Sequence, residues 1–150
     1  MKEINKNKEA LFNYQILENF EAGIVLSGPE VKAIKNGQIS LKGSYVSLDS
    51  KTNEAWLVNC HVSAYPPARN IQQDYDPLRK RKLLLHKREL ASLLGKNKQK
   101  GLTIIPLAVY TRKRLIKISL GLARGKTKLD KREAIKKRES DREIKRTLKK

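Results

Sequence analysis

Cys60 and His61 are the residues with which this sequence could most readily carry out nucleophilic chemistry. They are neighbours in an alternating apolar stretch that predicts a strand, so their side chains point to opposite faces and cannot act together as nucleophile and base. With two histidines, one cysteine and no CxxC or HExxH spacing, the chain has too few ligands for a zinc site. The GLARGK stretch lacks the glycine spacing that cradles a nucleotide phosphate.

The acidic residues predict no catalytic centre either. Before residue 126 the closest pairs are Glu18 with Glu21 and Asp74 with Asp76, and neither pair has a third acid or a histidine beside it. A two-metal centre needs more ligands than such a pair supplies. The sequence therefore predicts a binding module with no catalytic residues, no cofactor and no metal.

The excess of positive charge indicates the kind of partner. The 150 residues hold 34 Lys or Arg against 15 Asp or Glu, and the resulting net charge of +19 favours binding to nucleic acid. A membrane surface is less favoured, because the apolar runs are only a few residues long. The start MKEINKNKEA has no apolar segment behind its first charges, which predicts no secretory signal and a cytoplasmic protein.

Basic side chains gather in three segments: Arg79 to Lys82, Arg112 to Arg114, and residues 126–150. Each segment alone is as consistent with a solvated face as with a binding site, but the three together favour phosphate binding, with Arg79 and Arg81 as contacts. Aromatic residues make up only 5% of the chain, too few for the stacking platforms of proteins that read single strands. The predicted partner is folded RNA recognised by shape and phosphate.

Period-two patterns predict antiparallel strands. In YQILENFEAGIVL, one face collects Tyr14, Ile16, Phe20, Ala22, Ile24 and Leu26. SYVSLD and AWLVNCHVSAY predict a hairpin with Trp56, Val58, Cys60 and Val62 on one face. TIIPLAVY and LIKISLGLA predict a second hairpin, and Pro106 places its first strand at an edge or a bulge. In its second strand the pattern turns Ile116, Ile118, Leu120 and Leu122 inward, and Lys117 and Ser119 outward.

Helix signals are fewer. Ser27, Gly28 and Pro29 predict the start of a short helix that Gly37 ends. PPARNIQQDYDPLRKRK predicts a loop, and KLLLHKRELASLLGKN an extended piece followed by a helix that Gly95 can end. Several short strands with two small helices favour a mainly β fold: a small closed antiparallel OB-like barrel with short accessory helices over residues 1–125, and a basic C-terminal tail over residues 126–150.

A set of motifs then resembles one known family. FEAGIVLSGPEVKAIKNG, SYV, NCHVSAY, DPLRKRKLLLHKRE, GLTIIPLAVY and GLARGKTKLDKRE occur in the same order as in the bacterial SsrA-binding proteins, also called small protein B. The resemblance covers nearly the whole chain. It implies an OB-like barrel that binds the tRNA-like domain of transfer-messenger RNA and acts with the ribosome in trans-translation, the rescue of stalled ribosomes.

The resemblance also implies functional residues. RNA-contacting positions of the family's barrel fall on Glu21, Leu84, His86 and Lys117. A carboxylate repels phosphate, so Glu21 either accepts a hydrogen bond from a base or ribose or supports a neighbouring basic group, and Leu84 also fits a core position. Positions needed on the ribosome fall on Gly125, Lys126, Asp130, Lys131 and Arg132. Two residues depart from the family. Pro29 stands where the family usually has threonine, and Leu129 stands where it usually has an aromatic residue or histidine.

The tail is predicted to be disordered alone and helical when bound. Residues 126–150 contain twelve Lys or Arg and little apolar surface, so they cannot order themselves. Wound as a helix, they align a basic stripe, with Ile135 at its edge, made of Lys131, Arg138, Arg142, Lys145 and Lys149. The alternative is a solvated tail whose stripe is coincidental.

The leading hypothesis is thus a monomeric adaptor that docks transfer-messenger RNA onto the ribosome. A basic structural or assembly protein of the ribosome is the alternative, and an RNA-processing enzyme ranks third. The identity of the RNA that binds to the chain distinguishes the adaptor from the structural protein.

Overall fold

The computed structural model describes residues 1–71, 73–126 and 128–149, and within these ranges it describes side chains except at 69–71, 128–130, 134 and 146–149. The strands are β1 (Lys2–Lys6), β2 (Tyr14–Ile24), β3 (Ile39–Ser40), β4 (Tyr45–Asp49), β5 (Glu54–Val58), β6 (His61–Val62), β7 (Arg81–Leu84), β8 (Leu102–Arg112) and β9 (Leu115–Gly125). The helices are α1 (Lys8–Asn13), α2 (Gly28–Lys35), the 3₁₀ helix η1 (Pro66–Ile71), α3 (Lys87–Lys96) and α4 (Lys128–Lys149).

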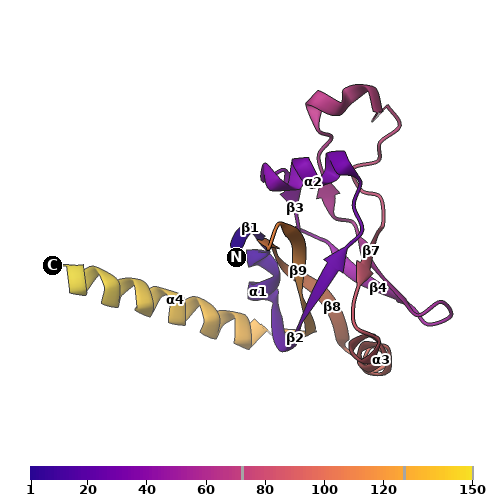
Figure 1. Cartoon of the computed structure of the whole chain (residues 1–150). Coiled ribbons are helices and arrows are strands. Elements are labelled where there is room, and N and C mark those ends of the chain that lie inside the picture. Colours follow the sequence, from indigo (N-terminus) through magenta and orange to yellow (C-terminus); the bar gives the residue numbers. More distant parts are fainter. Residues whose placement is uncertain (72, 127, 150) are drawn as a thin grey trace.

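A curved antiparallel sheet forms the body of the protein (Figure 1). Its seven strands lie in the order β1-β8-β9-β2-β7-β5-β4, and β3 pairs with β6 in a separate two-stranded sheet. The mainly β, antiparallel fold with short helices is confirmed. The accessory helices sit at the ends and rim of the sheet, whereas α4 extends away from it (Figure 1).

The predicted closed barrel is not confirmed. Within the described strands the hydrogen-bonded order ends at β1 and β4, and β4 lies against β8 without pairing to it. The outer edge of β8 is already occupied, because β1 pairs with it as far as Ala108 and the Asn7 side chain donates to the carbonyl of Pro106 at 2.9 Å. A cavity of about 330 Å³ lies at this seam, between α1, β4 and β8.

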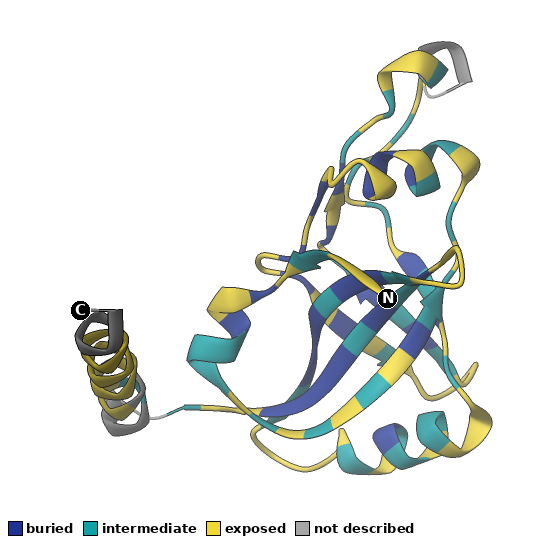
Figure 2. Cartoon of the chain, turned by 60° about the vertical axis from the view of Figure 1, so that its left-hand side comes forward, coloured by how far each residue is buried: buried dark blue, intermediate teal, exposed yellow. Residues whose placement is uncertain are grey.

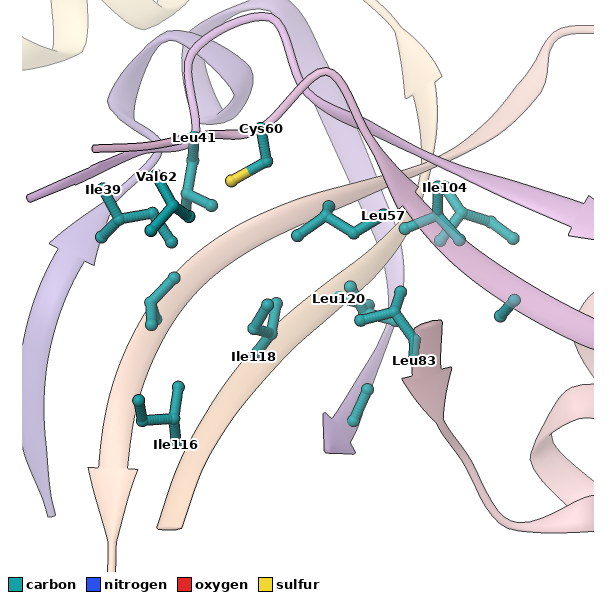
Figure 3. Close-up of a cluster of buried hydrophobic side chains, with 14 of the residues drawn as sticks. Ile39, Leu41, Leu57, Cys60, Val62, Leu83, Ile104, Ile116, Ile118 and Leu120 are labelled. Carbon is teal, nitrogen blue, oxygen red and sulfur yellow. The ribbon is translucent and has the colours of Figure 1, made fainter. Parts of the chain in front are cut away.

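The core lies on the concave face of the sheet, where buried residues gather (Figure 2). On β9 the residues that the sequence turns inward, Ile116, Ile118, Leu120 and Leu122, are all buried as predicted. Figure 3 shows side chains of neighbouring strands converging there, among them Leu57, Leu83, Ile104 and Leu120. Pro106 stands at a bulge, where the register between β8 and β9 shifts.

The predicted face of the second strand of the first hairpin is partly wrong. Ala55 and Leu57 are the buried residues of β5, whereas Trp56 and Val58 are only half-buried. Asn59 has a φ of +61°, and this left-handed residue separates β5 from β6 and reverses which residues face inward. Cys60 and Val62 beyond it are buried, so the four predicted residues do not share one face.

The helix at Gly28–Lys35 is confirmed together with its cap. The Ser27 hydroxyl accepts from the Glu30 N–H at 3.3 Å, and the Glu30 carboxylate accepts from the Ser27 N–H at 2.9 Å, a reciprocal capping box. Gly95 does not end α3, which continues to Lys96. No helix in the described part of the chain has the length and apolar character needed to cross a membrane.

Candidate nucleic-acid interface

Strand pairing brings three of the predicted RNA-contacting residues onto one face. Gly23 on β2 lies opposite Leu84 on β7 and opposite Lys117 on β9. Residues directly opposite each other share a face of the sheet, and so does Glu21, two residues before Gly23. The outward face formed by these neighbouring strands, defined here as Glu21, Gly23, Leu84, Tyr110, Arg112 and Lys117, is the candidate interface.

Gly23, which has no side chain, lets Leu84 and Lys117 approach each other in the middle of the candidate interface. A Cβ at this position would lie 3.4 Å from Cβ of Leu84 and 3.8 Å from Nζ of Lys117, so a larger side chain would fill the space between them. Leu84 is 53% exposed, which rejects the core reading of this residue. An exposed leucine beside a lysine amine offers apolar contact to a sugar or base and charge to a phosphate.

Glu21 is engaged by two side chains that the sequence reading did not connect with it. The Tyr110 hydroxyl donates to Oε2, and Nη1 of Arg112 lies 3.2 Å from Oε1 and 3.1 Å from Oε2. The hydrogen bond from Tyr110, aided by the charge of Arg112, lowers the pKa of Glu21. Burial and the bond to Glu21 raise the pKa of Tyr110 to about 12, so the phenol stays protonated and donates.

His86 lies beside this interface, two residues after Leu84, where β7 ends and α3 begins. It is exposed, and its backbone N–H donates to Oε1 of Glu89 at 3.4 Å. The exposed residues Lys87 and Arg88 follow it in the first turn of α3. The junction of β7 and α3 therefore has an exposed imidazole and two exposed cations within four residues of Leu84.

Arg81 does not contact phosphate in this fold, and that prediction is wrong. Its side chain is fully buried, and its donors are used by Oε2 of Glu30 at 2.6 Å, the Cys60 carbonyl at 2.8 Å and the Tyr75 hydroxyl at 2.9 Å. Arg79 donates to the same carboxylate but keeps 37% of its side chain exposed. Of the two predicted contacts, only Arg79 can reach a partner without unfolding the loop.

Glu30 is the anchor of this loop. Burial by itself raises the pKa of Glu30, but hydrogen bonds from Arg79, the Ser27 N–H and Arg81, with the charge of Arg81, lower it to about 2. Tyr75 ties the loop further, since its hydroxyl donates to the Val62 carbonyl at 2.7 Å. The buried carboxylate thus joins α2, the loop before β7 and the start of β7, which leads to Leu84.

Cys60 and His61 are not a catalytic pair. Cys60 is buried, and burial raises the pKa of its thiol to about 11, whereas His61 is exposed on the other side of the strand. Across the described residues, no group of three or more His, Cys, Asp or Glu side chains could hold a metal ion.

The tail begins where β9 ends and touches α1. After Gly125, the Lys126 N–H donates to the Asn13 carbonyl at 2.8 Å, and its Nζ donates to the Leu11 carbonyl at 3.3 Å. One turn of α4 also meets α1, with the Arg138 guanidinium 5.1 Å from the centre of the Phe12 ring.

The predicted tail residues after Lys126 lie along α4. Arg132, Arg138, Arg142 and Lys145 are exposed, and Lys131 is half-buried. The side chains of Leu129, Asp130 and Lys149 lie outside the described ones.

Comparison with known proteins gives consistent matches. Residues 4–150 match the family described as SmpB protein. The chain is 49% identical to an SsrA-binding protein of Sulfurihydrogenibium over 99% of this chain and 95% of the relative, and 50% identical to one of Persephonella marina over 96% and 92%. A solved structure described as "tmRNA-SmpB: a journey to the center of the bacterial ribosome" contains a chain with 44% identity and a TM-score of 0.66, covering 87% of this chain and 93% of the other.

Proposed function

The chain belongs to the SmpB protein family, and from that premise we propose that it is an RNA-binding adaptor of trans-translation. It binds the tRNA-like domain of transfer-messenger RNA and delivers this RNA to stalled ribosomes in the cytoplasm, where the nascent chain is tagged. It acts by binding and performs no chemistry of its own.

The observation that carries this proposal is the close approach of Leu84 and Lys117 over Gly23, at the centre of the candidate interface. Leu84 and Lys117 flank a residue without a side chain, Gly23, on three neighbouring strands of one sheet. An exposed leucine and an amine side by side on a sheet face suit the sugars and phosphates of a folded RNA and form no groove that reads bases. The net charge of +19 supplies the long-range attraction.

The division of labour between the parts of the chain belongs to the same proposal. Residues 1–125 act as an OB-like barrel, with β4 against β8 at its seam, and bind the RNA. Residues 126–150 are disordered alone and become helical as ribosomal RNA neutralises their basic stripe. The helical conformation of α4 is the one proposed for the bound tail, and the exposure of Arg138 and Arg142 supports their contact with ribosomal RNA.

Binding of a purified transcript tests the proposal. The full chain and a chain truncated after residue 125 are titrated with the tRNA-like domain of transfer-messenger RNA, with a ribosomal RNA hairpin of equal length as the matched control. Both chains are expected to bind the tRNA-like domain about a thousandfold more tightly than the hairpin, a ratio at the low end for specific recognition of nucleic acid. Equal affinities for the two RNAs would favour a structural or assembly protein of the ribosome instead.

A further inference from the structure

Glu21 is a carboxylate on a surface that must approach phosphate. On electrostatic grounds, its removal should strengthen RNA binding, because it would add one unit of positive charge to the candidate interface. A functional role for Glu21 therefore requires either a direct hydrogen bond to the RNA or an effect on a cation nearby. The structure distinguishes these two possibilities by what Glu21 already binds.

Both carboxylate oxygens of Glu21 are engaged within the protein. The side chain starts on β2 and reaches across β9 to residues of β8, past the short side chain of Ser119, which lies opposite Glu21. There Oε2 accepts from the Tyr110 hydroxyl, and both oxygens lie within 3.2 Å of Nη1 of Arg112. An RNA donor would have to compete with these contacts.

Tyr110 fixes the carboxylate and the carboxylate fixes Arg112. Tyr110 is buried, at 8% exposure, so its ring offers a rigid point of attachment. Arg112 has 59% of its side chain exposed and is the last residue of β8 before the turn. Its hydrogen bonds to described residues use only Nη1, which leaves Nη2 and Nε available to a ligand.

The turn after Arg112 supplies an untethered cation for comparison. Lys113 has a φ of +51° and Arg114 a φ of +69°, so the chain reverses within these two residues. Lys113 is exposed, and no ion pair is described for it in the ranges that the structure covers. Arg112 and Lys113 thus carry the same charge at the same rim, and among the described residues a carboxylate holds Arg112 but none holds Lys113.

We propose that Glu21 is a positioning residue that holds the guanidinium of Arg112 against an RNA phosphate, and that Arg112 is the contacting residue. The contact between Arg112 and the RNA would lie near Lys117, because Lys117 is opposite Tyr110, two residues before Arg112 on β8. The guanidinium has a planar set of donors, and fixing its plane in advance reduces the rotamer entropy lost on binding. The inference rests on the proposed function, because the ligand is the RNA bound there.

A double-mutant cycle tests the coupling. Full-length wild type, Glu21→Ala, Arg112→Ala and the double variant are titrated with a transcript of the tRNA-like domain at several salt concentrations. Loss of one phosphate contact lowers the slope of log K against log salt by about 0.7 to 0.9, which near 0.1 M salt is about a five- to eightfold loss of affinity. Glu21→Ala is expected to weaken binding and lower the slope as Arg112→Ala does, and the double variant to be no worse than either single one.

Further variants exclude a merely structural effect. Tyr110→Phe keeps the ring, removes the donor, and is expected to weaken binding in the wild type but not in Glu21→Ala. Lys113→Ala is the matched control and should lower affinity less than Arg112→Ala does. Thermal unfolding of every variant is measured, since a general loss of structure would shift the melting temperature without changing the salt slope.

The results that would contradict this inference differ from those that would contradict the proposed function. If Glu21→Ala tightens binding, or weakens it by the same factor in the presence and absence of Arg112, Glu21 does not act through Arg112 and the inference is wrong. In that case wild type still binds the tRNA-like transcript more tightly than a ribosomal hairpin. If wild type shows no such preference, the proposed function fails, and this inference fails with it.

Discussion

Replacing Glu30 by alanine should destabilise the protein more than any change at its surface ion pairs. The substitution removes the carboxylate that Arg81 and Arg79 share, and it leaves the guanidinium of Arg81, which is fully buried, without its ionic partner. Breaking a buried pair by removing one partner costs about 3 to 5 kcal/mol. The loop before β7 should then detach, because Arg81 also holds the Tyr75 hydroxyl and the Pro77 carbonyl.

The pKa of Glu30 gives a second measure of how much free energy of unfolding the carboxylate contributes. Its value falls from 4.5 to about 2 in the folded protein. At about 1.36 kcal/mol for each tenfold change, this difference corresponds to roughly 3 kcal/mol, which agrees with the lower end of the range for a buried pair. For a protein of this size, a loss of about 3 to 5 kcal/mol lowers the melting temperature by roughly 6 to 20 °C.

Urea unfolding followed by fluorescence measures the loss. Trp56 is the single tryptophan and lies on β5, opposite Lys82 of β7, so its emission reports on the region that Glu30 anchors. Glu54→Ala is the matched control, because Glu54 pairs with Lys82 at 3.1 Å where both side chains are partly exposed. The control should unfold at nearly the wild-type urea concentration.

The pH dependence follows from the sign of the pKa change. Because the pKa of Glu30 is lower in the folded than in the unfolded protein, its stabilisation is complete above about pH 4.5 and is lost as the pH falls towards 2. Wild type should therefore lose more stability than Glu30→Ala over this interval. The reasoning is refuted if Glu30→Ala unfolds at the same urea concentration as Glu54→Ala. It is also refuted if wild type and Glu30→Ala lose the same stability between pH 4.5 and pH 2.

The remaining predictions concern the RNA and the ribosome. Lys117→Ala should weaken binding of the tRNA-like domain about five- to eightfold near 0.1 M salt in a filter-binding assay, whereas Lys51→Ala, in the exposed turn between β4 and β5, should not change it. Truncation after residue 125 should preserve this binding yet abolish tagging of nascent chains in a reconstituted translation reaction. The double variant Arg138→Glu with Arg142→Glu should behave like the truncation, and normal tagging by it would show that the tail is only a solvated extension.

The inward face of β9 could be predicted because one physical rule governs its whole length. Its inward residues recur with period two, so Ile118 and Leu120 fall inward by the pattern alone, although from Leu120 to Ala123 the residues of the other face are buried as well. The same rule failed on the other hairpin at Asn59, where a single left-handed residue reverses the phase. Asparagine tolerates this conformation, yet nothing in its neighbours indicates that it adopts it here.

Arg81 shows why a run of basic residues is an unreliable guide to a binding site. Arg79 to Lys82 look alike in the sequence, but the strand places Arg81 inward, against a carboxylate 51 positions earlier. Glu30 could be predicted as a helix-capping residue from its spacing to Ser27, but its second role depends on a contact that no local pattern encodes. Charge alone therefore predicted the partner correctly in kind but misassigned one contact.

The candidate interface was predictable only in part for a similar reason. Glu21, Leu84 and Lys117 came from the resemblance to a family, and the strand register places them together. Arg112 belongs to one of the predicted basic segments, but Tyr110 and the link of both residues to Glu21 were missed, because that link crosses an intervening strand. The N-terminal elements β1 and α1 were also missed, since their mostly polar sequences carry little periodic signal.

Sequencing of the RNA that copurifies with the full chain from its native cells tests the central claim most directly. The account predicts one dominant species, transfer-messenger RNA, recovered with the wild type and strongly reduced with Lys117→Ala. Truncation after residue 125 should retain that RNA and lose ribosomal RNA. Recovery of stoichiometric ribosomal RNA without enrichment of a tRNA-like species would contradict the account.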